Sequence, residues 1–227
     1  MPRLIPVAGL ILLIGLWSPR ASGADKPAGV TVEKDRKRVV IDARIAPRKI
    51  DDPAFKEIYP VEVIACWAFP KGKKAHETVV TIEANPSAVH KALEELGLKA
   101  GKPVVGEVKE TAEGPEVNIF LEFTGADDQP KRLPIEKTLV DRKTNKNLPK
   151  LKWRFTGSVM TQTDPNKPEK VYGANVSGTL IAIFPVTDQT VFQTNLTMKE
   201  EKFVKLETDK KVLPKEGTPV KLVIEVP

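Results

Sequence analysis

An alternation of apolar and polar residues with a period of two limits the possible folds of this chain most strongly. It is clear in the segment EVNIFLEF, where four apolar residues share one face: Val117, Ile119, Leu121 and Phe123. The same pattern recurs at 153–159 and 220–226, and further strands are predicted at 38–45, 61–69, 76–84, 171–173 and 178–184. Such alternation is typical of strands with one face on a core and the other in water. The sequence therefore predicts an α+β fold, mainly antiparallel β, with one or two packed sheets.

A single segment has helical spacing instead. Its apolar stripe follows the i, i+3, i+4, i+7 rule and consists of Val89, Ala92, Leu93 and Leu96. Asn85 stands where its side chain can cap the free N–H groups, Pro86 suits the first helical position, and Gly97 suits the exit. We expect one α-helix at about 86–97, inserted between strands.

The N-terminal residues have the organisation of a secretory signal peptide. Arg3 provides a basic start, the run from Leu4 to Trp17 is apolar, and small residues follow at 21–24. The apolar run is shorter than the roughly 20 residues of a membrane-spanning helix. We therefore expect residues 1–24 to be a cleaved signal peptide, with only transient membrane contact through it. The expected location is the periplasm or cell envelope.

Residues 25–227 are expected to form a single β-rich domain. About 200 residues can bury roughly 70% of the surface of the unfolded chain in one domain. The polar, turn-rich segment 124–152 is the candidate boundary if the chain has two lobes. Because Cys66 is the one cysteine, no intramolecular disulfide is available and stability must come from an apolar core.

The charge pattern argues against nucleic acid as a partner. The chain has 36 basic and 30 acidic residues, a net charge of +6, in patches of mixed sign. Proteins that bind nucleic acid usually cluster their positive charge and add aromatic residues for stacking. Aromatic residues make up 6% of this chain, so the charges are read as a solvated surface.

A longer pattern at roughly 61–104, VEVIACWAFPKGKKAHETVVTIEANPSAVHKALEELGLKAGKP, resembles the YdjY-like domain of exported bacterial proteins. In that family a strand leads through a Gly/Lys loop to a His-Glu pair, a second strand, an Asx-Pro-Ser turn and an Ala-Leu helix. The resemblance extends more loosely to KWRFTGSVM and GTLIAIFPVTD. It implies fold and export but no particular reaction. Some members are labelled ferredoxin-like, yet an iron–sulfur cluster takes about four thiolates, so no cofactor is predicted here.

His76 and Glu77 are the first candidates for chemistry. A zinc-protease motif needs two histidines four residues apart on one helix face, but Val80 occupies the second position. The residues that follow favour a strand, which would point His76 and Glu77 to opposite faces. His76 and Glu77 therefore remain weak candidates for a catalytic pair.

Cys66, His76 and His90 form a second weak candidate, because thiolate and imidazole both bind zinc. If 61–69 and 76–84 form a hairpin, Phe69 lies opposite His76 and Cys66 lies opposite Val79. Cys66 and His76 are then about 10 Å apart along the strand, at about 3.3 Å per residue. This geometry argues against a metal site.

The structural interpretations fit these residues better. We expect His76 at a sheet rim near Phe69, His90 as a partly exposed helix residue, and Cys66 as a small buried apolar residue. Two functional hypotheses follow. The first is an exported, non-catalytic binding or structural module whose partner is an unknown envelope protein or ligand. The alternative is a hydrolase-like or metal-assisted enzyme that uses His76.

Overall fold

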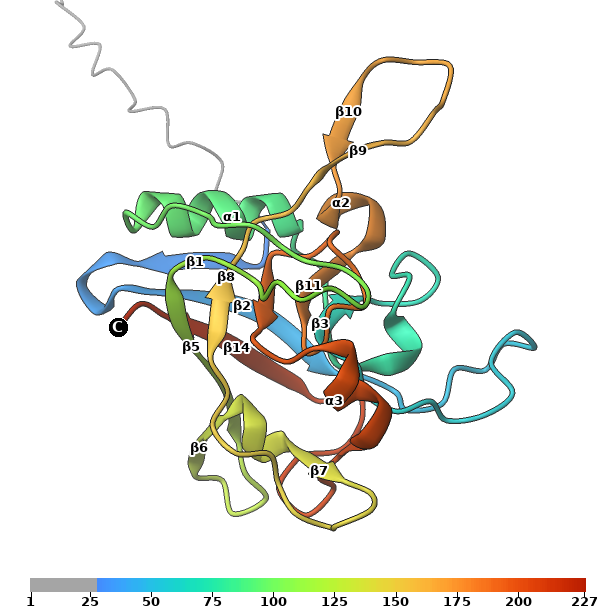
Figure 1. Ribbon diagram of the computed structural model, residues 1–227. Coiled ribbons are helices and arrows are strands. Elements are labelled where there is room, and N and C mark those ends of the chain that lie inside the picture. The colour runs from blue at the N-terminus through green and yellow to red at the C-terminus, as the bar shows by residue number, and fades with distance from the viewer. Residues whose placement is uncertain (1–27) are drawn as a thin grey trace, which may run out of the picture.

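Strands of residues 28–227, the part of the chain that the computed structural model describes, close into a barrel (Figure 1). The predicted signal peptide lies outside the described residues. Going around the barrel, the eight strands are β2 (Arg38–Ile45), β14 (Pro219–Glu225), β5 (Glu116–Thr124), β8 (Trp153–Phe155), β12 (Phe192–Thr194), β11 (Thr179–Ala182), β3 (Val63–Trp67) and β4 (Thr78–Ile82).

Strand β2 closes the barrel because it has different partners along one edge. Its first half pairs with β1 (Val30–Glu33) and its last three residues pair with β4, while its other edge pairs with β14 throughout. Most neighbouring strands are antiparallel. The prediction of a mainly antiparallel β fold is therefore confirmed, and the closed barrel is more specific than one or two packed sheets.

The apolar faces of the predicted strands fill the barrel. In β5 the burial alternates as the sequence indicated, and Ile119 and Leu121 are buried. The largest fully buried side chains include aromatic residues of β8 and β12, namely Trp153, Phe155 and Phe192. One continuous hydrophobic cluster joins these residues to the helix α1.

Helix α1 (Pro86–Glu95) lies beside β1 and the short helix α2 (Ala174–Ser177) (Figure 1). It ends two residues before the predicted limit, and Gly97 follows with φ +87°. The Gly97 and Leu98 N–H groups donate to the carbonyls of Glu94 and Leu93, which satisfies the end of the helix as a Schellman motif does. The prediction of a single helix is wrong, since α2 and α3 (Met198–Phe203) are also present. Both are too short to show a helical repeat in the sequence.

The N-terminus of α1 is capped from another element. Asn85 holds the N-cap position, but its side chain forms no capping hydrogen bond. Instead, Asn175 of α2 accepts from the Ser87 N–H at 3.0 Å through Oδ1 and donates to Ser87 Oγ at 2.7 Å through Nδ2. The cap that the sequence assigned to Asn85 is therefore provided by a residue 88 positions away from Ser87.

The predicted hairpin of 61–69 and 76–84 is wrong, because β3 and β4 are parallel. Cys66 lies opposite Thr81, and Val63 lies opposite Thr78. Parallel neighbours usually need a crossover of a dozen or more residues, whereas this connection spans only residues 68–77. The connection folds tightly onto β3 at Gly72, where a Cβ atom would lie 1.9 Å from the Trp67 carbonyl oxygen. A glycine at this position makes the close approach possible.

The remaining elements lie outside the ring of eight strands. β6 (Pro130–Pro134) pairs with β5, and β7 (Leu139–Asp141) pairs with β13 (Leu206–Thr208). Three 3-10 helices are η1 (Lys34–Arg36), η2 (Ala75–Glu77) and η3 (Ile135–Thr138). β9 (Met160–Gln162) and β10 (Lys170–Tyr172) form a ribbon that projects from the barrel (Figure 1). Segment 124–152 thus holds β6, η3 and β7, while β5 and β8 on either side of it pair with each other.

Candidate functional site

The region around His76 forms because the parallel strands β3 and β4 begin side by side. Glu62 precedes β3, and its N–H donates to the carbonyl of Glu77, which precedes β4, at 3.0 Å. The strand predicted for His76 and Glu77 is wrong: they belong to the 3-10 helix η2, and β4 begins at Thr78. In this turn His76 Nε2 lies 3.1 Å from Glu77 Oε1, so the two side chains meet instead of pointing to opposite faces.

Lys74 connects two carboxylates at the same place. Its Nζ donates to Glu62 Oε2 at 2.9 Å and to Glu77 Oε2 at 2.7 Å. Burial alone would lower the pKa of Lys74, but the two carboxylates outweigh it and raise the pKa. Burial also raises the pKa of Glu62, and the nearby Glu77 carboxylate adds to this. The ionisable groups therefore satisfy one another within a partly buried network.

Aromatic rings cover the imidazole of His76. Its ring centroid lies 4.5 Å from that of Phe55 and 5.1 Å from that of Tyr59. Nδ1 is buried and has no hydrogen-bond partner among the described residues. The carboxylate of Glu77 beside Nε2 favours a proton on that nitrogen, which leaves Nδ1 as an unprotonated acceptor. Burial lowers the pKa of His76, and the charges of Lys74 and Arg48 lower it further, so the ring is neutral at pH 7.

Arg48 fixes the segments that surround His76. Its buried guanidinium donates to the carbonyl of His76 at 3.2 Å, to the carbonyl of Tyr59 and to Glu207 Oε1 at 2.6 Å. Burial alone would raise the pKa of Glu207, but the hydrogen bonds from Arg48 and Arg142 lower it to about 2. One side chain thus holds together the 46–60 loop, η2 and β13.

The three candidate metal ligands have separate surroundings. Cys66 is fully buried, its Sγ lies 3.9 Å from the Thr179 hydroxyl, and burial raises its pKa. His76 contacts Glu77, as described above, whereas His90 contacts residues of α1 and β10. Among residues 28–227, no group of three or more His, Cys, Asp or Glu side chains is arranged to hold a metal ion.

His90 links α1 to the base of the projecting ribbon. Its Nδ1 is hydrogen-bonded to the Tyr172 hydroxyl at 2.7 Å, and its Nε2 lies 3.3 Å from Glu94 Oε1. Burial raises the pKa of Tyr172, so the phenol stays protonated. The expectation of a partly exposed His90 is confirmed. Its contact with Tyr172 was not expected.

A groove of about 930 Å³ lies on the outer face of the barrel, away from His76. It crosses the ends of β4, β2, β14, β5 and β6, and is lined by charged residues of both signs: Asp42, Arg44, Glu83, Glu122, Lys131, Arg132 and Lys221. Its volume lies within the range usual for ligand sites. A smaller cavity of about 280 Å³ lies beside Arg48. Neither of these two cavities is lined by His76.

Strand register arranges four of the groove residues in one row. Asp42 lies opposite Lys221, Lys221 opposite Glu122, and Glu122 opposite Arg132, so the sign of charge alternates across four strands. Lys221 forms an ion pair with Asp42, and Arg132 Nε lies 3.3 Å from Glu122 Oε1. Arg44, in the next row, forms no ion pair within residues 28–227.

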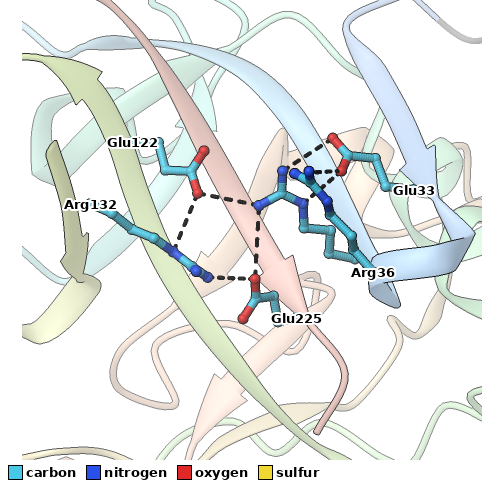
Figure 2. A network of polar contacts seen from close by, with 6 residues as sticks. Glu33, Arg36, Glu122, Arg132 and Glu225 are labelled. Atoms are coloured by element: carbon cyan, nitrogen blue, oxygen red, sulfur yellow. Dashed lines mark hydrogen bonds and ion pairs between the residues drawn. The ribbon is translucent and has the colours of Figure 1, made fainter. Parts of the chain in front are cut away.

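Glu122 and Arg132 of this row also belong to a network of arginines and glutamates from five adjacent segments (Figure 2). Arg38 lies 2.9 Å from Glu33 and 3.3 Å from Glu122, and Arg132 pairs with Glu225. The guanidinium of Arg132 also covers the Phe120 ring at 3.9 Å. The network therefore holds one side of the groove in place.

Sequence reasoning found His76 and Glu77 but missed their partners. Lys74, Glu62 and Arg48 come from loops and strand ends, where no periodic pattern indicates which side chains meet. The alternation of β2, β5 and β14 did indicate that the groove charges face outward. It did not indicate which strands are neighbours, so the row could not be predicted.

A mainly antiparallel, closed eight-stranded barrel with polar sites on its outside defines the class of this protein. The YdjY domain family model matches residues 30–225, so the chain belongs to the YdjY domain family, as the resemblance implied. Searches of curated proteins and of solved structures found no match. No helix within residues 28–227 has the length and apolar character needed to span a membrane.

Proposed function

We propose that this chain is an exported cell-envelope protein whose barrel is a non-catalytic binding module. The groove on the outer face is the proposed ligand site. The observation that carries this proposal is the row of alternating charges along an open cavity of ligand size. The signal-peptide pattern of residues 1–24 supports export.

The charge of the groove favours a polar ligand that carries both signs. Lys221 and Asp42 are more than half exposed, with 55% and 63% of their side-chain surface accessible. Exposed ion pairs contribute only about 0–1 kcal/mol, so a ligand can replace them at small cost. Arg44 and Glu83 at the same end add a cation and an anion without an ion-pair partner among the described residues.

The alternative of an enzyme that uses His76 has weaker support. A general base needs a nitrogen within reach of a substrate. In His76 one nitrogen contacts Glu77 and the other is buried under Phe55, and neither cavity reaches the ring. Glu62, Lys74 and Glu77 lie close together because Lys74 donates hydrogen bonds to both carboxylates, so their clustering does not require a catalytic role.

Site-specific photo-cross-linking in the native cell envelope tests the binding proposal. A photoreactive residue at Thr124, on the groove wall, should capture a defined product, while one at Gln162 on the projecting ribbon should not. Arg44→Glu should abolish the Thr124 product, whereas Lys167→Glu, a surface charge far from the groove lining, should preserve it. Equal products at both positions, or no effect of Arg44→Glu, would refute the groove as the binding site.

Export is tested by N-terminal sequencing. Protein recovered from the envelope should begin near Ala24 or Asp25. An intact Met1 in a soluble cytoplasmic fraction would overturn the proposed location.

A further inference from the structure

One wall of the groove holds an anion and a cation side by side, and neither has an ion-pair partner among residues 28–227. Glu83 follows β4 directly, and its carboxylate also forms no hydrogen bond within the described residues. Arg44 of β2 donates from Nη1 to the Gly217 carbonyl at 3.3 Å, and its guanidinium makes no other hydrogen bond to this part of the chain. Both side chains are exposed, so both charges are available to a ligand.

Strand register places these two side chains on the same face of neighbouring strands. Arg44 lies opposite Thr81, and Glu83 follows Thr81 by two residues. Diagonal neighbours of this kind have Cα atoms about 7–8 Å apart, and strand side chains stand roughly perpendicular to the sheet. Arg44 and Glu83 do not form an ion pair with each other, which leaves the space between their charged ends to a ligand.

A second carboxylate lies beside Glu83. Continuing the β2–β4 register by one residue places Asp42 opposite Glu83. The position of Gly29 agrees, because a Cβ atom on it would lie 3.7 Å from the Cβ of Asp42 and 4.0 Å from that of Ala84. Like charges directly opposite each other on a sheet are unfavourable, and the exposed ion pair of Asp42 with Lys221 compensates only one of them. A cation is therefore favoured between Asp42 and Glu83.

A ligand that meets both charges must carry a positive and a negative group close together. Charge-assisted hydrogen bonds are about 2.7–2.9 Å long, so one at each end takes up most of the separation between Arg44 and Glu83. The ammonium and the carboxylate of the ligand are then only a few ångströms apart, as they are in an α-amino acid. A guanidinium also matches the geometry of a carboxylate, which it binds through two parallel hydrogen bonds.

We propose that the groove binds a free α-amino acid, with its ammonium at Glu83 and Asp42 and its carboxylate on the Arg44 guanidinium. The small residues Ala68 and Gly29 line the groove beside Glu83 and leave space for the side chain of the amino acid. This assignment rests on the groove being the ligand site, and it adds the class of ligand.

Isothermal titration calorimetry with neutral amino acids and their derivatives tests the proposal. At least one of L-alanine, L-leucine and L-glutamine should bind the protein recovered from the envelope with a Kd of about 1 mM or tighter. N-acetylation removes the ammonium group and amidation removes the carboxylate charge. Each should weaken binding at least about tenfold, because each removes a charged hydrogen-bonding group.

A charge exchange between the two side chains provides the sharper test. Arg44→Glu and Glu83→Arg should each weaken binding at least about tenfold at an unchanged melting temperature, since both side chains are exposed. The double variant should bind at least about threefold more tightly than either single variant, because the zwitterion can then bind in the reverse direction. Lys167→Glu with Glu169→Arg, an exposed pair beyond the groove lining, is the matched control and should leave the affinity unchanged.

Three results would each overturn the assignment of the ligand: no binding of any of the three amino acids, equal binding of the acetylated and amidated forms, or a double variant no better than the single ones. If the photoproduct at Thr124 still forms in such a case, the groove binds a ligand of another class. If that product is also absent, the groove is not the binding site and the proposed function fails with it.

Discussion

The cap of helix α1 leads to a quantitative prediction about two asparagines. Asn175 accepts a hydrogen bond from the Ser87 N–H and donates one to the Ser87 hydroxyl, whereas the side chain of Asn85, at the N-cap position, forms no capping bond. We expect Asn175→Ala to destabilise the protein and Asn85→Ala to change its stability very little. A sequence-based reading assigns the larger effect to Asn85.

The magnitude follows from the two bonds that Asn175 makes. Loss of a capping acceptor at a helix N-terminus costs about 1 kcal/mol. Loss of a neutral side-chain hydrogen bond costs about another 1 kcal/mol. Asn175→Ala should therefore lower the free energy of unfolding by about 2 kcal/mol. Asn85→Ala should lower it by no more than a few tenths of a kcal/mol, because the Asn85 side chain is exposed and forms no hydrogen bond within residues 28–227.

Urea unfolding followed by circular dichroism measures both variants, and Asn175→Asp is the control. The aspartate keeps the acceptor at Ser87 N–H, and its charge is favourable at a helix N-terminus, so it should recover about half or more of the loss. If Asn85→Ala costs as much as Asn175→Ala, capping across elements is not what stabilises this helix.

Three further predictions concern stability and its dependence on pH. Leu93 is fully buried, so Leu93→Ala should cost about 2–5 kcal/mol, and His76→Ala should cost less because His76 lies at the edge of the core. Because burial lowers the pKa of His76, the unfolded chain binds a proton there more readily than the folded one, and stability should fall as the pH drops below the ordinary value of 6.5. His76→Gln should reduce this loss of stability, measured by urea unfolding at neutral and at mildly acidic pH. An unchanged pH dependence would show that His76 does not cause the loss. Glu207 has a pKa of about 2 against an ordinary 4.5, so its contribution is complete above pH 4.5 and is lost towards pH 2. After allowance for partial exposure, Glu207→Gln should lower the free energy of unfolding by about 1–2 kcal/mol at pH 7. An unchanged melting temperature would show that the buried Arg48 guanidinium is held in place without this carboxylate.

The periodic parts of the chain could be predicted from sequence. The apolar alternation of 116–123 and 38–45 corresponds closely to β5 and β2, and the stripe through Leu93 corresponds to α1. These patterns indicate which side chains face the core, and they depend only on residues that are close together in the sequence. Strands that are neighbours in the barrel can be far apart in the sequence, so these patterns do not predict that β2 closes the barrel.

The connection between β3 and β4 shows why the candidate site was misplaced. A short link between two strands normally indicates a hairpin, so His76 was placed opposite Phe69 in an antiparallel pair. In the structure the link contains a 3-10 turn and the strands are parallel, which brings Glu62 beside Glu77 and Lys74 between them. Phe55 and Arg48, which complete the surroundings of His76, come from a loop without any periodic pattern.

The position of β14 has a consequence for the order of folding. This strand, the last in the sequence, lies inside the barrel wall between β2 and β5, and it pairs with residues 38–44 and 118–122. The wall therefore stays open until residues 219–225 have emerged, however early β2 and β5 form. Contacts between such distant parts of the chain give a high contact order, which slows folding. The complete barrel therefore forms only after residues 28–225 have all been synthesised.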